Sequence, residues 1–396
     1  MAEDLSVPGS LVDLTPEWMT EVLRRSGALL EGRVAAVESE IMGRDIGFSS
    51  TLARLSLEYD GTGGAGPASV IAKFPSVDSK MRAWVQLYQG YEREVRFFSE
   101  LAGRCSQRTG RCFYAGMDKQ SGDLIRTRDR RIAQSMPGWL QGALVPLARL
   151  YARVRKRRYL LLLEDLGSKR LGNQIEGADF DDAQRVARAL GGLHAEFWNA
   201  EVLTTSGWLP ARVGKLPGVR SSYRRHRDSF YRSAAVTPPP RFIDLMAWAD
   251  DNLAAILANL EDAPVTLLHG DCGLENIFFD DTHVWLIDWQ SASIGPGILD
   301  WAYFVIGNLR QEVGEDDELA LLEIYHDQLR SEGASGYGLG DCRRHYRLAK
   351  LFLALTMVGW PDWNGPRTAR LGALMLQRHQ RLFARLPDSD WSDCLS

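Results

Sequence analysis

The stretch from Leu267 to Asp288, LLHGDCGLENIFFDDTHVWLID, constrains this chain more than any other, because polar residues interrupt short apolar runs at close intervals. These runs predict three strands, at residues 265–268, 276–279 and 283–287. Asp280 to Thr282 separate the last two strands and predict a tight hairpin turn. The sequence therefore predicts a strand, a polar loop that contains His269-Gly270-Asp271, and then a hairpin.

The predicted hairpin brings side-chain oxygens together. A turn centred near Asp281 places Asn276 opposite Leu286, and Asp288 then falls beside Asn276 at the open end. Asp271 projects from the loop just before them. Such oxygens suit Mg²⁺, which shares its other positions with phosphates and water. A carboxylate beside the ion can orient a hydroxyl and accept its proton. The alternative is that both aspartates cap loops and Asn276 is a turn residue.

Two motifs in this stretch resemble a known family. HGD followed by Asn276, and then Ile287-Asp288-Trp289, resemble the aminoglycoside phosphotransferase, choline kinase and ecdysteroid-kinase-like group, which shares the protein-kinase fold. HGDxxxxN is similar to the kinase catalytic loop, and IDW to the DFG motif. The resemblance implies an ATP-dependent phosphotransferase with an alcohol group as acceptor. It also implies that Asp271 is the catalytic base and that Asn276 and Asp288 hold Mg²⁺.

The same resemblance predicts the fold class and the domains. It implies an α+β, bilobal protein-kinase-like fold, with a small lobe of antiparallel sheet plus a helix and a large, mostly helical lobe. The expected bounds are residues 1–163 for the nucleotide-binding lobe, 164–167 for the hinge, and 168–396 for the catalytic and substrate-binding lobe. A chain of 396 residues is long for one core, which independently favours two lobes.

A glycine-bearing segment in the first lobe is a candidate for phosphate contacts. An N-terminal helix is expected over residues 14–30, and strands over 34–41 and 51–59. The hairpin between these strands can lay backbone N–H groups over phosphates, and it resembles the family's nucleotide loop. It departs from GxGxxG, so an ordinary hairpin is the alternative. The nucleotide contacts expected here are Gly43, Gly47, Phe48 and Ser49.

A lysine and a glutamate are expected to form an ion pair in the first lobe. Lys73 lies among apolar residues in a predicted strand, 69–74, where an unpaired charge is costly. Kinase-like folds use such a lysine on the α- and β-phosphates. A single helix is predicted over residues 84–101, and Glu94 on it is the expected partner, with Glu92 as the second candidate. The alternative for Lys73 is an edge-strand side chain that points to water.

The predicted hinge follows a continuous apolar run, residues 159–164, that is typical of a buried strand. The resemblance implies that adenine bonds to backbone groups around Glu164 to Leu166. Beyond it, helices are expected from Phe180, over 241–260, from Asp300, and over 318–332, 341–359 and 371–386. Asp300 is expected to brace the catalytic loop, as the resemblance implies, with an N-cap of its own helix as the alternative; one carboxylate can serve both roles because it accepts several bonds. The loop Trp360 to Asn364 either packs as a lid or walls a substrate pocket.

Composition excludes several other classes of protein. The net charge of −4 argues against general nucleic-acid binding. The basic run 153–158 is interpreted as a solvated face, with contact to an acidic substrate or partner as the alternative. The role of the basic stretch 220–232 stays open, because no fold signal supports nucleic-acid contact there. No apolar run approaches the length of a membrane span, and MAEDLSVPGS is not typical of a signal peptide. The five cysteines form no CxxC pair, which favours free thiols and a cytoplasmic protein. Cys272, next to Asp271, is interpreted as a small filler rather than a nucleophile.

The function expected from these observations is a small-molecule kinase that uses ATP and Mg²⁺ on a hydroxyl-bearing substrate, with no membrane or nucleic-acid partner. Two alternatives come from other classes. A nucleotide-binding pseudokinase would lack Asp271, Asn276 or Asp288, and all three are present. A metal-dependent hydrolase would use His269, Asp271 and Asp288, but would leave Lys73 and the glycine loop unexplained.

Overall fold

The computed structural model describes residues 5–42, 49–60, 66–118, 157–213, 216–232, 238–360, 372–378, 391 and 395. The chain divides into two compact units. Unit 1 contains residues 1–104, 109–169 and 288–291. Unit 2 contains residues 105–108, 170–287 and 292–396.

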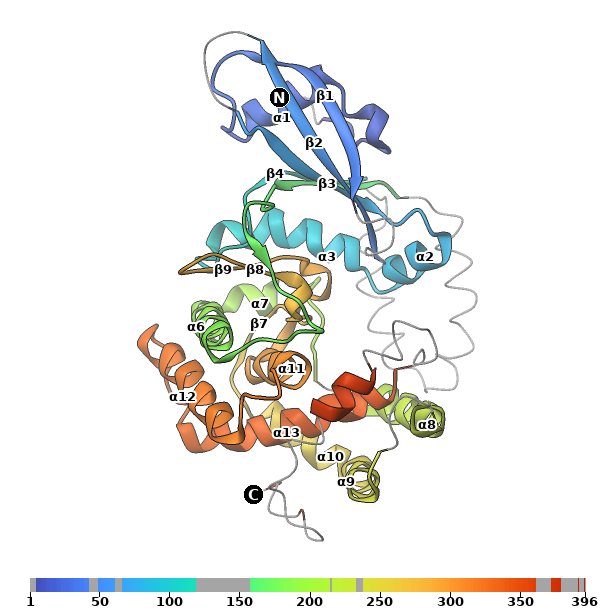
Figure 1. Ribbon diagram of the computed structural model, residues 1–396, viewed down its shortest axis with the longest axis vertical. Coiled ribbons are helices and arrows are strands. Elements are labelled where there is room, and N and C mark those ends of the chain that lie inside the picture. The colour runs from blue at the N-terminus through green and yellow to red at the C-terminus, as the bar shows by residue number, and fades with distance from the viewer. Residues whose placement is uncertain are drawn as a thin grey trace. The chain divides into compact units, whose positions relative to one another are not determined.

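Unit 1 is built on a five-stranded sheet in the order β1-β2-β3-β5-β4, in which every neighbouring pair is antiparallel (Figure 1). The strands are β1 (Arg33–Met42), β2 (Ser50–Asp60), β3 (Ser69–Pro75), β4 (Cys112–Met117) and β5 (Tyr159–Glu164). Helix α1 (Pro16–Arg25) begins at proline, and the Thr15 side chain caps it by accepting from the Trp18 N–H. Met19 and Leu23 of this helix join Leu55 and Val70 of the sheet in one buried apolar core.

The helix predicted over residues 84–101 is wrong as a single element. The structure has α2 (Ser79–Leu87), α3 (Gly90–Arg96) and a π-helical turn (Phe97–Leu101). The break lies at Gln89, whose φ of 58° is left-handed. Gly90 follows it, and a Cβ there would lie 2.7 Å from the Val85 side chain, so only glycine fits this close approach.

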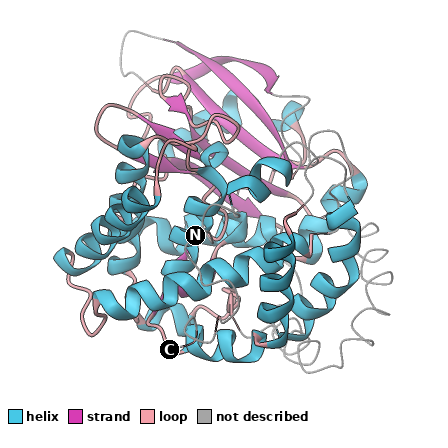
Figure 2. Ribbon diagram, turned by 60° about the horizontal axis from the view of Figure 1, so that its bottom comes forward, coloured by secondary structure: helices cyan, strands magenta, loops and turns pink. Residues whose placement is uncertain are grey.

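Unit 2 is mainly helical (Figure 2). Its helices are α6 (Phe180–Glu196), α7 (Glu201–Thr205), α8 (Leu216–Arg232), α9 (Pro240–Asp251), α10 (Leu253–Glu261), α11 (Ile298–Asn308), α12 (Glu315–Ser331) and α13 (Leu339–Val358). Helices α6 and α12 pack together, and α13 packs against α8, α9, α10 and α11. Helix α6 also contacts strand β7 (Val265–Leu268). None of the helices among the described residues is long and apolar enough to cross a membrane.

Two of the helices predicted for unit 2 differ from the observed ones. The predicted helix over 241–260 is two helices that meet at Asn252, whose side-chain amide bonds the Trp248 carbonyl at 2.9 Å and whose ψ of 9° leaves the helical range. Helix α11 begins at Ile298 rather than at Asp300. Residues 361–364 of the tryptophan loop, and much of the predicted helix 371–386, lie outside the described residues.

Two small sheets carry the central stretch of the sequence. β7 (Val265–Leu268) pairs with β10 (Ser293–Pro296), and β8 (Ile277–Phe279) lies between β6 (Arg170–Leu171) and β9 (Val284–Leu286). The predicted hairpin register is wrong by one residue. Leu286 faces Ile277, not Asn276, because Asp280 Oδ1 accepts from the N–H groups of Thr282 and His283 and moves the turn centre by half a residue.

Candidate functional site

The loop after β7 is held by one buried carboxylate. Asp300, on the first turn of α11, accepts from the His269 N–H at 2.6 Å and from the Gly270 N–H at 3.0 Å. Gly270 has φ of 82°, a conformation that a side chain disfavours. Asp300 therefore braces the loop that presents Asp271. The alternative that Asp300 caps its own helix is wrong, because Gly297 is the N-cap of α11.

Two histidines support the same loop. His269 Nε2 donates to the Ile287 carbonyl at 2.8 Å, and its Nδ1 accepts from the Asp271 N–H at 3.3 Å. One neutral tautomer makes both bonds, so each ring nitrogen of His269 has a structural partner. His194 is fully buried and contacts Asp300 at 3.5 Å and the Tyr325 hydroxyl at 2.9 Å. It lies in the core.

Electrostatics keep Asp300 ionised. Burial raises the pKa of this carboxyl, but the hydrogen bond and charge from His194, together with the Gly270 N–H, outweigh it. The net result is a pKa below the usual value of 3.8. The Asp300 carboxyl is therefore charged in the folded protein, and this charge stabilises the loop through the bonds to His269 and Gly270.

Asp271 receives a hydrogen bond that the sequence reasoning missed. The Tyr303 hydroxyl donates to Asp271 Oδ1 at 2.7 Å, and both side chains are half-buried. The negative charge of Asp271, together with burial, raises the pKa of Tyr303 well above its usual value of 10.0. The neighbouring Cys272 is fully buried, and burial raises the pKa of its thiol well above 9.0. This favours the interpretation of Cys272 as a filler rather than a nucleophile.

The Asn276 side chain is oriented by the same loop. Its Nδ2 donates to the Asp271 carbonyl at 3.0 Å, so the amide oxygen of Asn276 faces away from that carbonyl. Asn276 ends a short 3₁₀ helix, Leu274–Asn276, and the Leu274 N–H donates to Asn308 Oδ1 at 2.9 Å. Asn276 also accepts from the Ile287 N–H at 3.0 Å through its backbone carbonyl. The loop, the 3₁₀ turn and the hairpin are therefore joined within unit 2.

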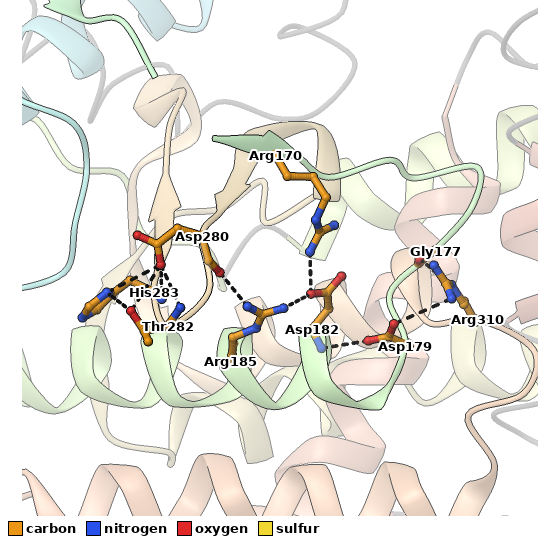
Figure 3. Close-up of polar contacts among 9 residues, drawn as sticks. All are labelled: Arg170, Gly177, Asp179, Asp182, Arg185, Asp280, Thr282, His283 and Arg310. Carbon is orange, nitrogen blue, oxygen red and sulfur yellow. Dashed lines mark hydrogen bonds and ion pairs between the residues drawn. The ribbon is translucent and has the colours of Figure 1, made fainter. Parts of the chain in front are cut away.

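An arginine network attaches the hairpin to α6 (Figure 3). Arg185 Nη1 donates to the Asp280 carbonyl at 2.6 Å, and Arg185 also contacts Asp182 at 2.5 Å. Arg170 of β6 contacts the same Asp182 at 2.7 Å, and its guanidinium lies 4.5 Å from the centre of the Phe279 ring. Two arginines thus flank one nearly buried carboxylate and connect α6, β6 and the hairpin.

Unit 1 contains a second cluster of charged residues. Lys73 Nζ contacts Glu94 Oε1 at 2.7 Å and Asp288 Oδ1 at 3.0 Å. Lys73 lies on β3, the central strand of the sheet, and its side chain is 8% exposed, so the alternative of an edge-strand lysine that points to water is wrong. Glu92, the second candidate partner, instead contacts Arg96 and Arg157.

Burial and charge act against each other in this cluster. Burial lowers the pKa of Lys73, but the charges of Asp288 and Glu94 outweigh it and raise the pKa above 10.5. Burial raises the pKa of Glu94, and although Lys73 opposes this, the charge of Asp288 adds to it. A carboxylate pair that shares one buried ammonium carries excess negative charge. Such a cluster is suited to accept a further cation.

The backbone at Asp288 is unusual. Its φ of 64° is left-handed, and among the described residues only Gln89 and Asn199 share this feature outside glycine. The next residues hold the turn in place. The Trp289 ring stacks on Phe97 with 3.8 Å between the ring centres, and the backbone N–H of Trp289 donates to Glu94 Oε1 at 3.3 Å. Strain of this kind persists only where the surroundings impose it, and it is common at functional sites.

The predicted hinge begins at Glu164, the last residue of β5, and continues beyond the strand. The Glu164 N–H donates to the Arg111 carbonyl at 2.8 Å, and its carboxylate accepts from the Arg111 N–H at 2.9 Å. The Leu166 carbonyl accepts from the Lys169 N–H at 2.9 Å. Asp165 between them accepts from Arg54 at 2.7 Å and from the Ser69 hydroxyl at 2.8 Å, so it ties this segment to β2 and β3.

The glycine-bearing nucleotide segment is described only at its end. Gly43, Gly47 and Phe48 lie outside the described residues. Ser49 is described, and its carbonyl accepts from the Tyr91 hydroxyl at 2.5 Å. Ser50, the next residue, accepts from Gln290 Nε2 at 2.7 Å through its hydroxyl. The segment therefore leads directly into β2 beside the Trp289 turn.

Comparison with protein families identifies the chain. Residues 131–337, a little more than half of the chain, match the profile of the phosphotransferase enzyme family. The chain belongs to this family. The predicted relationship is thereby confirmed, and the matched part contains the HGD loop, Asn276 and the IDW motif. A search of curated proteins finds no match to the sequence.

Solved structures of a choline kinase and of a macrolide 2'-phosphotransferase match this chain. A choline kinase from Cryptosporidium parvum Iowa II matches with a TM-score of 0.51 at 9% identity, covering 93% of this chain and 96% of the other. A macrolide 2'-phosphotransferase from Brachybacterium faecium matches with a TM-score of 0.43 at 14% identity, covering 91% of this chain and 98% of the other. The choline kinase match confirms the predicted protein-kinase-like fold.

Two residues of this family member were not foreseen from the sequence. Tyr303 lies three residues after Asp300, so both lie on one helix face, and that spacing was the available signal. Arg212 lies near Tyr303 and Cys272, since its charge lowers the pKa of both. Its N–H donates to the Ile294 carbonyl on β10 at 2.8 Å. No sequence motif marks Arg212, because the chain around it is irregular.

Proposed function

We propose that this chain is a small-molecule kinase that transfers the γ-phosphate of ATP to a substrate hydroxyl. The observation that carries the proposal is the buried contact of Lys73 with both Glu94 and Asp288, where Asp288 adopts a left-handed backbone. A lysine that serves only in a structural ion pair needs one carboxylate partner, whereas Lys73 contacts two carboxylates. Family membership supports phosphoryl transfer as the chemistry.

In this proposal the first lobe, residues 1–163, binds the nucleotide. Lys73 contacts the α- and β-phosphates, and Glu94 keeps its ammonium in place, because the ion pair is almost fully buried. Gly43, Gly47, Phe48 and Ser49 supply backbone groups around the phosphates. The hinge, residues 164–167, bonds adenine through its backbone at Glu164 and Leu166. The Glu164 carbonyl is the better candidate there, since its N–H already bonds Arg111.

The donor set of Asn276 and Asp288 fits Mg²⁺. Asn276 directs its amide oxygen away from the Asp271 carbonyl, and the Asp288 side chain is 29% exposed with one oxygen on Lys73. Among the residues that the structure describes, no three His, Cys, Asp or Glu side chains group around a metal position. An amide and one carboxylate nevertheless match the few protein ligands that Mg²⁺ takes beside phosphates. The bound ion would neutralise phosphate charge during transfer.

Asp271 is the proposed catalytic base. It accepts the proton of the substrate hydroxyl, whose oxygen bonds to the γ-phosphorus as the bond to the β-phosphate oxygen breaks and ADP leaves. The loop is rigid at this point, because Asp300 binds the N–H groups of His269 and Gly270. Such rigidity supports a group that orients a hydroxyl within hydrogen-bond reach.

The structure argues against the metal-dependent hydrolase. The hydrolase hypothesis requires His269 to act as a metal ligand or as a base. His269 donates through Nε2 to the Ile287 carbonyl and accepts through Nδ1 from the Asp271 N–H. Neither nitrogen can bind a metal without breaking one of these bonds. We therefore assign His269 a structural role in the catalytic loop.

The test is a nucleotide-consumption screen. Purified wild type is incubated with MgATP and a panel of hydroxylated metabolites, and phosphorylated products are identified by mass spectrometry. Asp271→Ala is expected to lower turnover by about 10²–10⁴-fold. If Asp271→Ala forms the phosphorylated product as fast as wild type, Asp271 is not the catalytic base. If ATP hydrolysis persists in Lys73→Ala and no phosphorylated acceptor is found, the kinase proposal is overturned.

A further inference from the structure

We propose that Tyr303 is a positioning residue for the catalytic base: its hydroxyl holds one oxygen of Asp271 so that the carboxylate faces the acceptor hydroxyl. This inference rests on the proposed function. The contact is short and direct, with Tyr303 Oη 2.7 Å from Asp271 Oδ1, and both residues belong to unit 2. No motif or family comparison drew attention to Tyr303.

Helix α11 holds the loop from one face. Asp300 and Tyr303 are three residues apart on α11, so their side chains lie one above the other. Asp300 accepts from the backbone of His269 and Gly270, and Tyr303 donates to the side chain of Asp271. The helix thus binds three consecutive loop residues, the first two by main chain and the third by its carboxylate.

Tyr303 serves as a permanent donor. The charge of Asp271 and burial keep its phenol protonated far above neutral pH, although the charge of Arg212 acts in the opposite direction. A protonated phenol has one O–H, and that O–H points at Oδ1. A carboxylate accepts several hydrogen bonds, so this contact leaves capacity for a substrate hydroxyl.

Two effects of this hydrogen bond compete. A donor makes a carboxylate a weaker base, which by itself would slow proton abstraction. It also restricts the carboxylate to one orientation, which favours reaction. In phosphoryl transfer the transition state is loose and depends mainly on positioning and electrostatics. Orientation therefore outweighs basicity, and removal of the hydroxyl is expected to slow turnover.

The experiment compares two tyrosine-to-phenylalanine variants. Tyr303→Phe removes only the hydroxyl. Tyr346→Phe is the matched control, because Tyr346 also donates to a carboxylate at 2.7 Å, that of Glu318, in the α12–α13 pair. The probes are MgATP and MgGTP, with phosphate release to water and transfer to the acceptor from the screen both measured. Tyr303→Phe should lower kcat about 10- to 100-fold while KM for the nucleotide stays unchanged, whereas Tyr346→Phe should keep wild-type kcat.

A double-mutant cycle separates positioning from folding. If Tyr303 acts through Asp271, then Tyr303→Phe should cause no further loss of kcat in an Asp271→Asn background. Equal kcat in wild type and Tyr303→Phe overturns the inference and leaves the proposed function standing. An equal further loss in the Asp271→Asn background also overturns it, since the effect then does not pass through Asp271. A wild type that transfers no phosphate from either nucleotide overturns the proposed function itself.

Discussion

The carboxylate of Asp300 accepts a hydrogen bond from the His269 N–H across 2.6 Å, although 31 residues separate them in the chain. The same carboxylate binds the Gly270 N–H and contacts His194. A side chain on one helix therefore determines the path of the loop after β7. The contribution of Asp300 to folding stability, and the dependence of that contribution on pH, can therefore be measured.

Asp300→Asn should destabilise the protein in a pH-dependent way. The pKa of Asp300 is lowered below 3.8, so its stabilising effect is present above that pH and is lost as the pH falls through the folded-state value. At pH 7 the variant should lose about 2–4 kcal/mol, because a buried charged acceptor is replaced. The difference in unfolding free energy from wild type should shrink below pH 4. A difference that stays constant from pH 7 to pH 3 would contradict this electrostatic account.

Lys73→Met should separate stability from nucleotide binding. The substitution leaves Glu94 buried without its ammonium partner, which should cost roughly 3–5 kcal/mol in denaturant unfolding. Lys73→Met/Glu94→Gln should recover much of that loss, since the buried charge is gone, but it should not recover ATP affinity. Lys80→Met, on an exposed position of α2, is the control and should change neither property. If the double variant binds ATP as tightly as wild type, Lys73 does not bind the phosphates.

The sequence predicted strands and some charged contacts well but failed at breaks and turns. The bounds of β5 and β7 match the expected ones, and the structure brings Lys73 and Glu94 into contact. Continuous apolar runs and an otherwise costly buried lysine give such signals. Helix breaks at Gln89 and Asn252 were missed, because they depend on local packing and on a side-chain bond to the backbone.

Finer details of the candidate site also depended on contacts that the sequence pattern does not reveal. The hairpin register was wrong by one residue because the Asp280 side chain decides the turn centre. Tyr303 was missed for a related reason. Its contact with Asp271 requires the rotation of α11 relative to the loop after β7, and only tertiary packing specifies that rotation. The roles of Asp271, Asn276 and Asp288 remain predictions for the experiments above.

Arg185→Met should loosen the hairpin that follows Asn276. Arg185 donates from α6 to the Asp280 carbonyl, so its loss removes this tie and leaves the contacts of Gln107 and Arg108 on the β9 side of the hairpin (Figure 3). Hydrogen exchange of amides in β8 and β9 should become faster, while exchange in the five-stranded sheet should be unchanged. Arg188→Met, on the exposed face of the same helix, is the matched control. Equal exchange in both variants would show that the hairpin does not depend on Arg185.

Cys272 should be chemically inert in the folded protein. It is fully buried and its thiol pKa is raised well above 9.0, mainly by burial, so almost no thiolate exists at neutral pH. Iodoacetamide at pH 7.5 should leave Cys272 unmodified in mass-spectrometric peptide maps and should modify it in denaturant. Cys272→Ala should keep near-wild-type turnover at a stability cost of about 1 kcal/mol, since a small buried group is lost. Complete loss of turnover in a folded Cys272→Ala variant would instead support a nucleophilic role for the residue beside Asp271.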